Sequence, residues 1–167
     1  MQNRPSLITN VSRNITLKLG RWAPLPVRFI VGFGFIAHGY SKLSRGPDHF
    51  AAILQALGVP SPNVMAWLTI AVELLGGLAV LLGMFVILAS IPMIIVLLTA
   101  LFTVHLHNGF NSVKLLAVTP AGVQFGPVGY EVNLLYIAGL VTLVLGGAGP
   151  LSIDGALASK QPKLAVG

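Results

Sequence analysis

The stretch that decides the fold runs from Val64 to Gly83 and reads VMAWLTIAVELLGGLAVLLG. It is long enough to cross a bilayer, which requires about 20 predominantly apolar residues, and Glu73 is its only charged residue. A charged side chain at that depth costs roughly 2.5–3.5 kcal/mol on insertion scales. Such a residue is expected to face the interior of a helical bundle, to have a partner and to mark a candidate site.

The composition favours a membrane protein. The 167 residues are 55% hydrophobic and only 8% charged, against about 25% charged in soluble domains, so the chain cannot cover a water-facing surface. It has no cysteine, which excludes disulfides, CxxC redox chemistry, thiolate nucleophiles and cysteine-ligated metals. The net charge of +6 favours contact with anionic lipids rather than with nucleic acid.

Hydropathy predicts an all-α integral membrane protein with a bundle of four transmembrane helices. The expected spans cover residues 27–43, 64–83, 85–106 and 130–148, within a domain at residues 24–154. Only Met84 separates the second span from the third, so these two should form a tight helical hairpin. Residues 155–167 should be a cytoplasmic tail.

Three segments outside the spans have their own patterns. Residues 1–23 form a basic amphipathic arm that should lie on the membrane surface as a helix, with a disordered basic tail as the alternative. A cleaved signal peptide fits less well, because Arg28 interrupts its apolar core. His49–Leu57 should form a short amphipathic helix. Residues 107–129, rich in Gly and Pro, should fold over the mouth of the bundle.

The distribution of Lys and Arg indicates the orientation. An even number of spans puts the basic residues of both termini on one side, which should be the cytoplasm. These residues are Arg4, Arg13, Lys18, Arg21, Lys160 and Lys163. His38, Glu73, His105 and Glu131 then all fall in the outer half of the bundle, whereas Arg28 lies alone near the inner end of the first span.

Alternatives remain for several of these residues. Gly76 and Gly77 share a helix face with Glu73 and should pack closely against a neighbouring helix, in which case Glu73 could be a purely structural hydrogen-bonding group. Lys42 lies one turn after His38 and could extend to the lipid headgroups. A metal site of His105, Glu73 and Glu131 is chemically feasible, but no spacing motif requires it, and we predict no metal.

Several short blocks, in their order and spacing, resemble the DoxX family over about residues 28–154. The first-helix block is Phe35–Leu43 (FIAHGYSKL) and the second-helix region holds Leu57–Pro60 (LGVP) and Glu73–Gly77 (ELLGG). The remaining matches are His105, Tyr130-Glu131 and Gly149–Asp154 (GPLSID).

The resemblance implies a bacterial inner-membrane protein with four helices and a role linked to quinone or membrane oxidoreductases. The polar residues in the matching blocks are Arg28, His38, Lys42, Glu73, His105 and Glu131. From their chemistry we take Glu73, His105, Glu131 and His38 as candidate catalytic residues, and Arg28 and Lys42 as candidates for binding a quinone or a lipid headgroup. The expected partners are membrane lipids, a soluble oxidoreductase and further copies of the chain. The alternatives are a non-enzymatic scaffold for soluble oxidoreductases and a small transporter.

Overall fold

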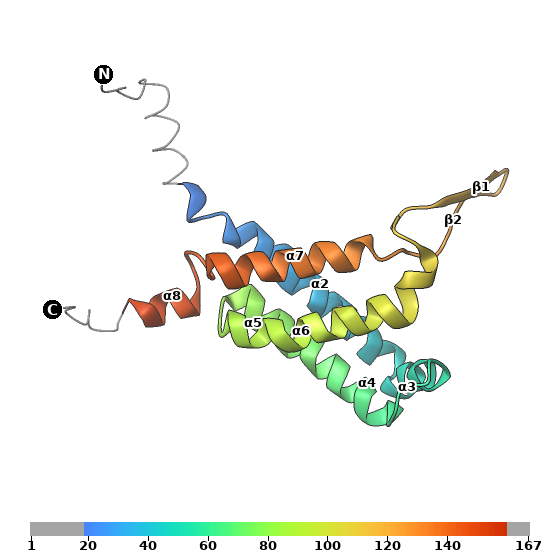
Figure 1. Cartoon of the computed structure of the whole chain (residues 1–167), viewed down its shortest axis with the longest axis horizontal. Coiled ribbons are helices and arrows are strands. Elements are labelled where there is room, and N and C mark those ends of the chain that lie inside the picture. Colours follow the sequence, from blue (N-terminus) through green and yellow to red (C-terminus); the bar gives the residue numbers. More distant parts are fainter. Residues whose placement is uncertain (1–18, 160–167) are drawn as a thin grey trace, which may run out of the picture.

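A computed structural model of the chain describes residues 19–159. Most of the described residues are helical, and helix α2 (Pro24–Arg45) passes beside most of the others (Figure 1). The expected interfacial arm at residues 1–23 lies almost entirely outside the described residues. The expected tail at residues 155–167 begins inside a short helix, α8 (Ile153–Ala158).

The stretch around Glu73 forms a continuous helical rod, composed of α4 (Pro62–Ala71), the π-helical turn η1 (Val72–Gly76) and α5 (Gly77–Leu82). A second rod consists of α6 (Val86–Ala100), the π-helical turn η2 (Leu101–His105) and the 3₁₀ turn η3 (Leu106–Asn108). Both rods, Pro62–Leu82 and Val86–Asn108, are long and apolar enough to cross a membrane. The tight hairpin expected between them is confirmed, because the connecting Gly83 and Phe85 both have left-handed backbone conformations.

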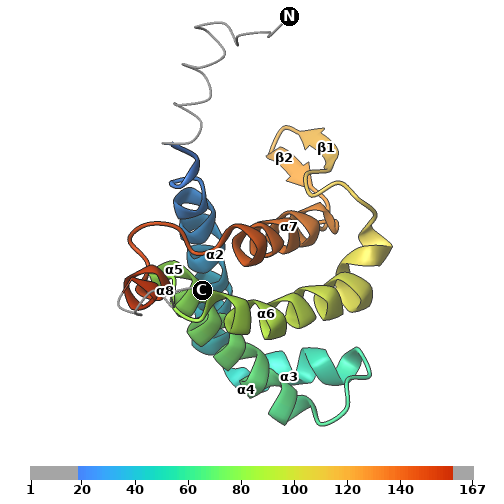
Figure 2. The same ribbon diagram turned by 60° about the vertical axis from the view of Figure 1, so that its left-hand side comes forward.

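Two further helices complete the arrangement. Helix α7 (Glu131–Gly146) is apolar but shorter than the two rods. The predicted amphipathic helix after the first span is confirmed as α3 (Pro47–Ala56). Helix α6 lies between α7 on one side and the α3–α4 pair on the other (Figure 2).

Small residues allow α2 and the rod from α4 to α5 to approach closely. Helix α2 packs against α5 and η1, and a Cβ atom added to Gly32 would lie 2.7 Å from the carbonyl oxygen of Gly77. The reciprocal atom on Gly77 would lie 2.8 Å from the carbonyl oxygen of Gly32. The expectation that Gly77 packs against a neighbouring helix is therefore confirmed, and the close approach directs Glu73 toward α2.

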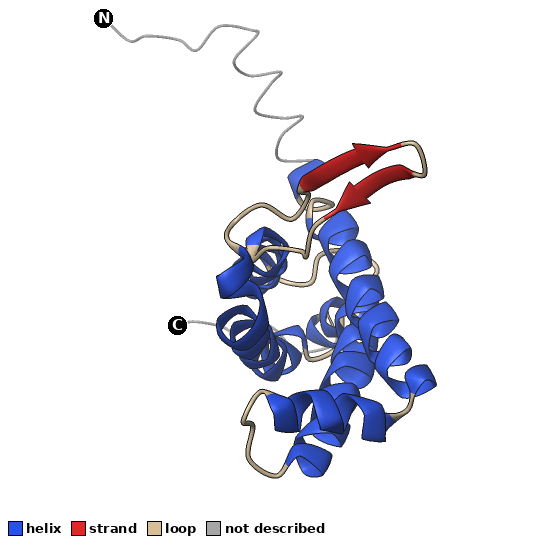
Figure 3. Ribbon diagram, turned by 90° about the vertical axis from the view of Figure 1, so that its right-hand side faces the viewer, coloured by secondary structure: helices blue, strands red, loops and turns tan. Residues whose placement is uncertain are grey.

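The segment between η3 and α7 corrects the expectation of an entirely helical fold. It contains an antiparallel hairpin of β1 (Leu115–Thr119) and β2 (Gly122–Phe125). The hairpin stands away from the helices at the end of the molecule opposite α8 (Figures 1 and 3). Val118, Thr119, Val123 and Phe125 suit strands, but the Gly and Pro residues that punctuate this segment indicate a loop.

Candidate functional site

Glu73 and His105 both lie in π-helical turns, η1 and η2. A π-helical turn widens one turn of an α-helix and occurs frequently at functional sites. The two π-helical turns of the described chain therefore fall on two of the four residues that the sequence indicated as candidate catalytic groups. This local geometry sets the direction in which each side chain leaves its helix.

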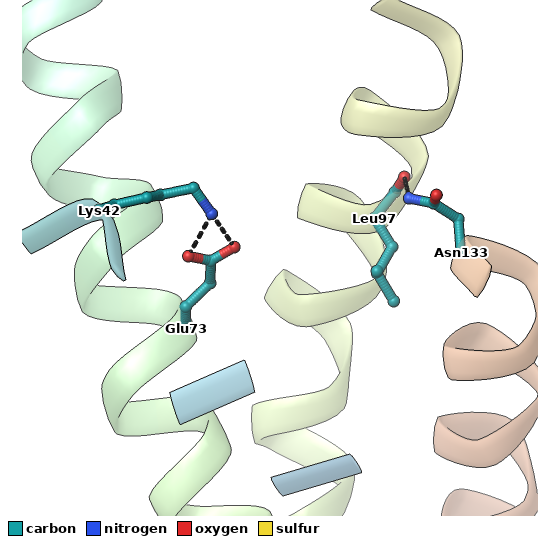
Figure 4. Close-up of polar contacts among 4 residues, drawn as sticks. All are labelled: Lys42, Glu73, Leu97 and Asn133. Carbon is teal, nitrogen blue, oxygen red and sulfur yellow. Dashed lines mark hydrogen bonds and ion pairs between the residues drawn. The ribbon is translucent and has the colours of Figure 1, made fainter. Parts of the chain in front are cut away.

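Glu73 is 5% exposed and forms an ion pair with Lys42 of α2. Lys42 Nζ lies 2.5 Å from both Oε1 and Oε2 of Glu73 (Figure 4). The ammonium group also lies 5.1 Å from the centre of the Phe50 ring on α3, a favourable cation–π distance. Lys42 therefore turns into the bundle and not toward the headgroups, and two of its three N–H donors are used by Glu73.

The ion pair borders two cavities. The smaller, of about 250 Å³, lies among α2, α6 and α7, and the larger, of about 450 Å³, lies among α3, α4 and α6. Five residues line both cavities, namely Lys42, Glu73, Val96, Ala100 and His105. Two of the three ionisable groups in this set are joined as an ion pair, so the wall between the cavities carries both donors and acceptors.

His38, His105, Asn133 and Tyr136 add polar groups to the smaller cavity. His105 Nδ1 lies 3.0 Å from the carbonyl oxygen of Val128. Since a carbonyl oxygen only accepts, Nδ1 donates, which leaves Nε2 of a neutral ring as an acceptor. The His38 ring packs edge-on against Tyr136, with 6.5 Å between ring centres. The smaller cavity thus combines an apolar wall with several hydrogen-bonding groups.

Two residues of this cavity were missed by sequence reasoning. Asn133 is buried and donates from Nδ2 to the carbonyl oxygen of Leu97, which joins α7 to α6 (Figure 4). The hydroxyl group of Tyr136 lies against Gly34 of α2. The sequence did contain one signal for them: Asn133 and Tyr136 are three residues apart, so they share one face of the helix.

Glu131 lies apart from the ion pair and lines neither cavity. Its Oε2 accepts a hydrogen bond from the backbone N–H of Ser112, at 3.0 Å. The Ser112 hydroxyl oxygen in turn accepts from the backbone N–H of Val132. Glu131 therefore holds the segment after η3 against the start of α7. Among residues 19–159, no group of three or more His, Cys, Asp or Glu is arranged to hold a metal ion.

Arg28 lies at the opposite end of the bundle from the cavities. It is 2% exposed and donates hydrogen bonds to five backbone carbonyl groups. Two of these belong to the end of α5 and three to the segment after α7, as follows: Val80, Leu81, Ala148, Pro150 and Leu151. The five donors of a guanidinium group are thereby all used, so the structure gives Arg28 a structural position.

Comparison with known proteins identifies the family of the chain. The DoxX family model matches residues 23–106, half of the chain, a range that holds Arg28, His38, Lys42, Glu73 and His105. An uncharacterized membrane protein of Mycobacterium tuberculosis is 28% identical over 145 residues, with 80% of each chain covered. No solved structure matches. With its two long apolar helices, the chain is a membrane protein, and it belongs to the DoxX family.

Proposed function

We propose that this chain is a quinone-binding, redox-associated protein of the bacterial inner membrane. Its four spans would be α2, the rod from α4 to α5, the rod from α6 to η3, and α7, with both termini in the cytoplasm. The observation that carries the proposal is the position of the Lys42–Glu73 pair and His105 on the wall shared by two cavities. Ligand sites are typically apolar pockets with a few placed polar groups, and the two cavities with these three polar residues on their shared wall fit that description.

The polar groups at the wall suit a quinone headgroup. A quinone carbonyl oxygen accepts hydrogen bonds, and Lys42 retains one N–H donor beyond the two directed at Glu73. When a quinone takes up two electrons, its two oxygens also take up two protons to give the quinol. In the reverse direction, oxidation of the quinol, the Glu73 carboxylate and Nε2 of His105 would accept those two protons, with His38 as a relay. The electrons would be exchanged with a partner protein or a substrate, and the chain has no cysteine that could carry them.

The proposal narrows the set of candidate residues. Glu73, His105 and His38 remain candidates for contact with the ligand, and Lys42 joins them as a hydrogen-bond donor. Glu131 becomes a positioning residue for the segment that supplies Val128 to the cavity. Arg28 is left out of the ligand site because its donors are all used by backbone carbonyl groups.

Binding of a tail-less benzoquinone to the purified protein in detergent micelles tests the proposal. We expect saturable binding by the wild type, and a Kd at least about tenfold higher for Glu73→Gln, which corresponds to about 1.4 kcal/mol. Asp48→Asn is the matched control, because it makes the same carboxylate-to-amide change at an exposed residue outside both cavities, and its Kd should stay within about twofold of the wild type.

Two results would overturn the proposal: wild-type protein that binds no quinone, or Glu73→Gln protein that binds it as tightly as the wild type. If quinone binding were absent while a soluble oxidoreductase was still recruited to the membrane, the scaffold hypothesis would replace it. Solute flux through reconstituted vesicles without quinone binding would instead favour the transporter hypothesis.

A further inference from the structure

The larger cavity differs in chemistry from the smaller one. It runs along α6 and η2 from Pro92 to Val104, which at a rise of 1.5 Å per residue is about 18 Å of helix. Its walls are formed mainly by apolar side chains of α3, α4 and α6. Thr69, Thr99 and Thr103 also line it. Thr99 and Thr103 each donate the hydroxyl proton to a carbonyl oxygen of their own rod, at 2.9 and 2.8 Å, and Thr69 lies one turn before Glu73. The cavity is therefore elongated and offers few free donors along its length.

The polar groups of this cavity gather at one place. Lys42, Glu73 and His105 form the part of its lining that it shares with the smaller cavity. An elongated apolar space with a small polar cluster on one wall matches a ligand with a long apolar chain and a compact polar head. Burial of such a chain contributes about 0.8 kcal/mol per CH₂ group removed from water.

The charge of this cluster determines whether an anionic or a neutral headgroup fits it. Lys42 is neutralised by Glu73, which receives the ammonium group on both carboxylate oxygens. A phosphate headgroup would require uncompensated positive charge, such as Arg or Lys without an acidic partner, and Arg28 lies at the other end of the bundle with its donors used. A neutral head that accepts hydrogen bonds fits this cluster better than an anionic one.

We propose that the larger cavity binds the apolar chain of a long-chain neutral amphiphile, whose hydrogen-bonding head lies at the Lys42–Glu73 pair. This inference rests on the function proposed above, since a quinone with an isoprenoid tail is such an amphiphile. It adds that the tail is recognised by the protein, and it identifies α3, α4 and α6 as the elements that do so.

Two isoleucines of α6 provide a matched pair for the test. Ile95 and Ile91 are one turn apart and similarly exposed, at 58% and 56%, but only Ile95 lines the larger cavity. In Ile95→Trp the indole would fill part of the space that the chain needs, whereas in Ile91→Trp it would not. Binding of two benzoquinones with the same ring, one with an isoprenoid tail and one without, is measured for both variants and the wild type.

We expect Ile95→Trp to raise the Kd of the tailed quinone at least about tenfold while that of the tail-less quinone changes less than about twofold. Ile91→Trp should leave both unchanged, which also controls for partition of the tailed quinone into micelles. The inference would be overturned if both variants weakened the binding of both quinones equally, or if Ile95→Trp had no effect. The proposed function would still stand in either case, as long as binding of the tail-less quinone depends on Glu73.

A second measurement uses only the wild type, so it does not depend on how the variants fold. A tailed quinone with a photoreactive group at the end of its tail is crosslinked to the full-length protein, and the labelled peptides are mapped by mass spectrometry. We expect labels on α3, α4 or α6. Labels confined to α7, or a phospholipid retained in the larger cavity and not displaced by the tailed quinone, would contradict the inference.

Discussion

Arg28 and Lys42 belong to the same helix, α2, and both turn into the bundle, but their surroundings differ. Arg28 donates to five backbone carbonyl groups and borders neither cavity. Lys42 faces a carboxylate and both cavities. A cation whose donors are all used by the backbone fixes the helices and has none left for a ligand. A cation that is paired beside a cavity keeps a donor for a ligand. The comparison therefore separates a structural end of the molecule from a candidate binding end.

The largest effect should come from the structural end. Arg28→Leu removes five hydrogen bonds and leaves the carbonyl groups of two chain segments without their shared donor, so we expect the free energy of unfolding to fall by roughly 3–5 kcal/mol. Thermal unfolding in detergent micelles measures this loss. Arg28→Lys should recover only part of it, because Lys has three donors. An Arg28→Leu protein with wild-type stability but no quinone binding would show that Arg28 serves binding and not stability, contrary to the comparison.

A smaller effect is expected at the candidate binding end. Glu73→Gln leaves Lys42 without a counter-charge, and because the Lys42 side chain is 24% exposed, we expect a loss of about 2 kcal/mol, less than for a fully buried pair. The double variant Lys42→Met/Glu73→Gln removes both charges and should regain most of that stability. Unfolding and quinone binding are measured on the same samples.

The double variant distinguishes a structural role of the pair from a binding role. If the pair only fixes helix packing, recovery of stability should bring quinone binding back with it. If the pair contacts the ligand, the double variant should be stable and still bind weakly. A stable double variant that binds weakly would support a binding role for the pair. A double variant that regains both stability and binding would show that the pair is structural, like Arg28.

The smallest effect should come from Asp154, which lies at the structural end with Arg28. Its Oδ1 and Oδ2 accept from the backbone N–H groups of Phe85 and Val86, at 2.8 and 3.1 Å, and so cap the start of α6. Loss of such a cap costs about 1 kcal/mol, and we expect that loss for Asp154→Ala with quinone binding unchanged. Asp48→Ala is the control, since Asp48 is exposed in the first turn of α3 without a capping hydrogen bond. Weaker quinone binding by Asp154→Ala would show that the two ends are coupled.

The sequence predicted the helices well because apolar length and breaking residues are local properties. Gly83, for example, ends α5 in a left-handed conformation that suits glycine, and Pro47 and Pro62 begin α3 and α4 at the first helical position, where no N–H is needed. The strands β1 and β2 were missed, because their pairing is a contact between segments and their Val and Leu residues lie among loop-forming neighbours.

The candidate site was predicted in part. His38, Glu73 and His105 do come together around the cavities, because they lie at related depths on neighbouring helices. Glu131 was expected among them on the same argument, but depth alone does not give the direction of a side chain, and it turns to Ser112 instead. Asn133, two residues later, faces the cavity in its place.

By itself, the sequence determined that this chain is a membrane protein with a costly acid in an apolar helix, since composition and hydropathy fix how much surface must avoid water. Only the tertiary structure decided that Lys42, and not a histidine, is the partner of Glu73, that the pair divides two cavities, and that Arg28 is confined to the backbone at the far end. These outcomes depend on the rotation of each helix about its axis. That rotation is set by close contacts such as that of Gly32 with Gly77 and by the π-helical turns, and no local sequence pattern specifies it.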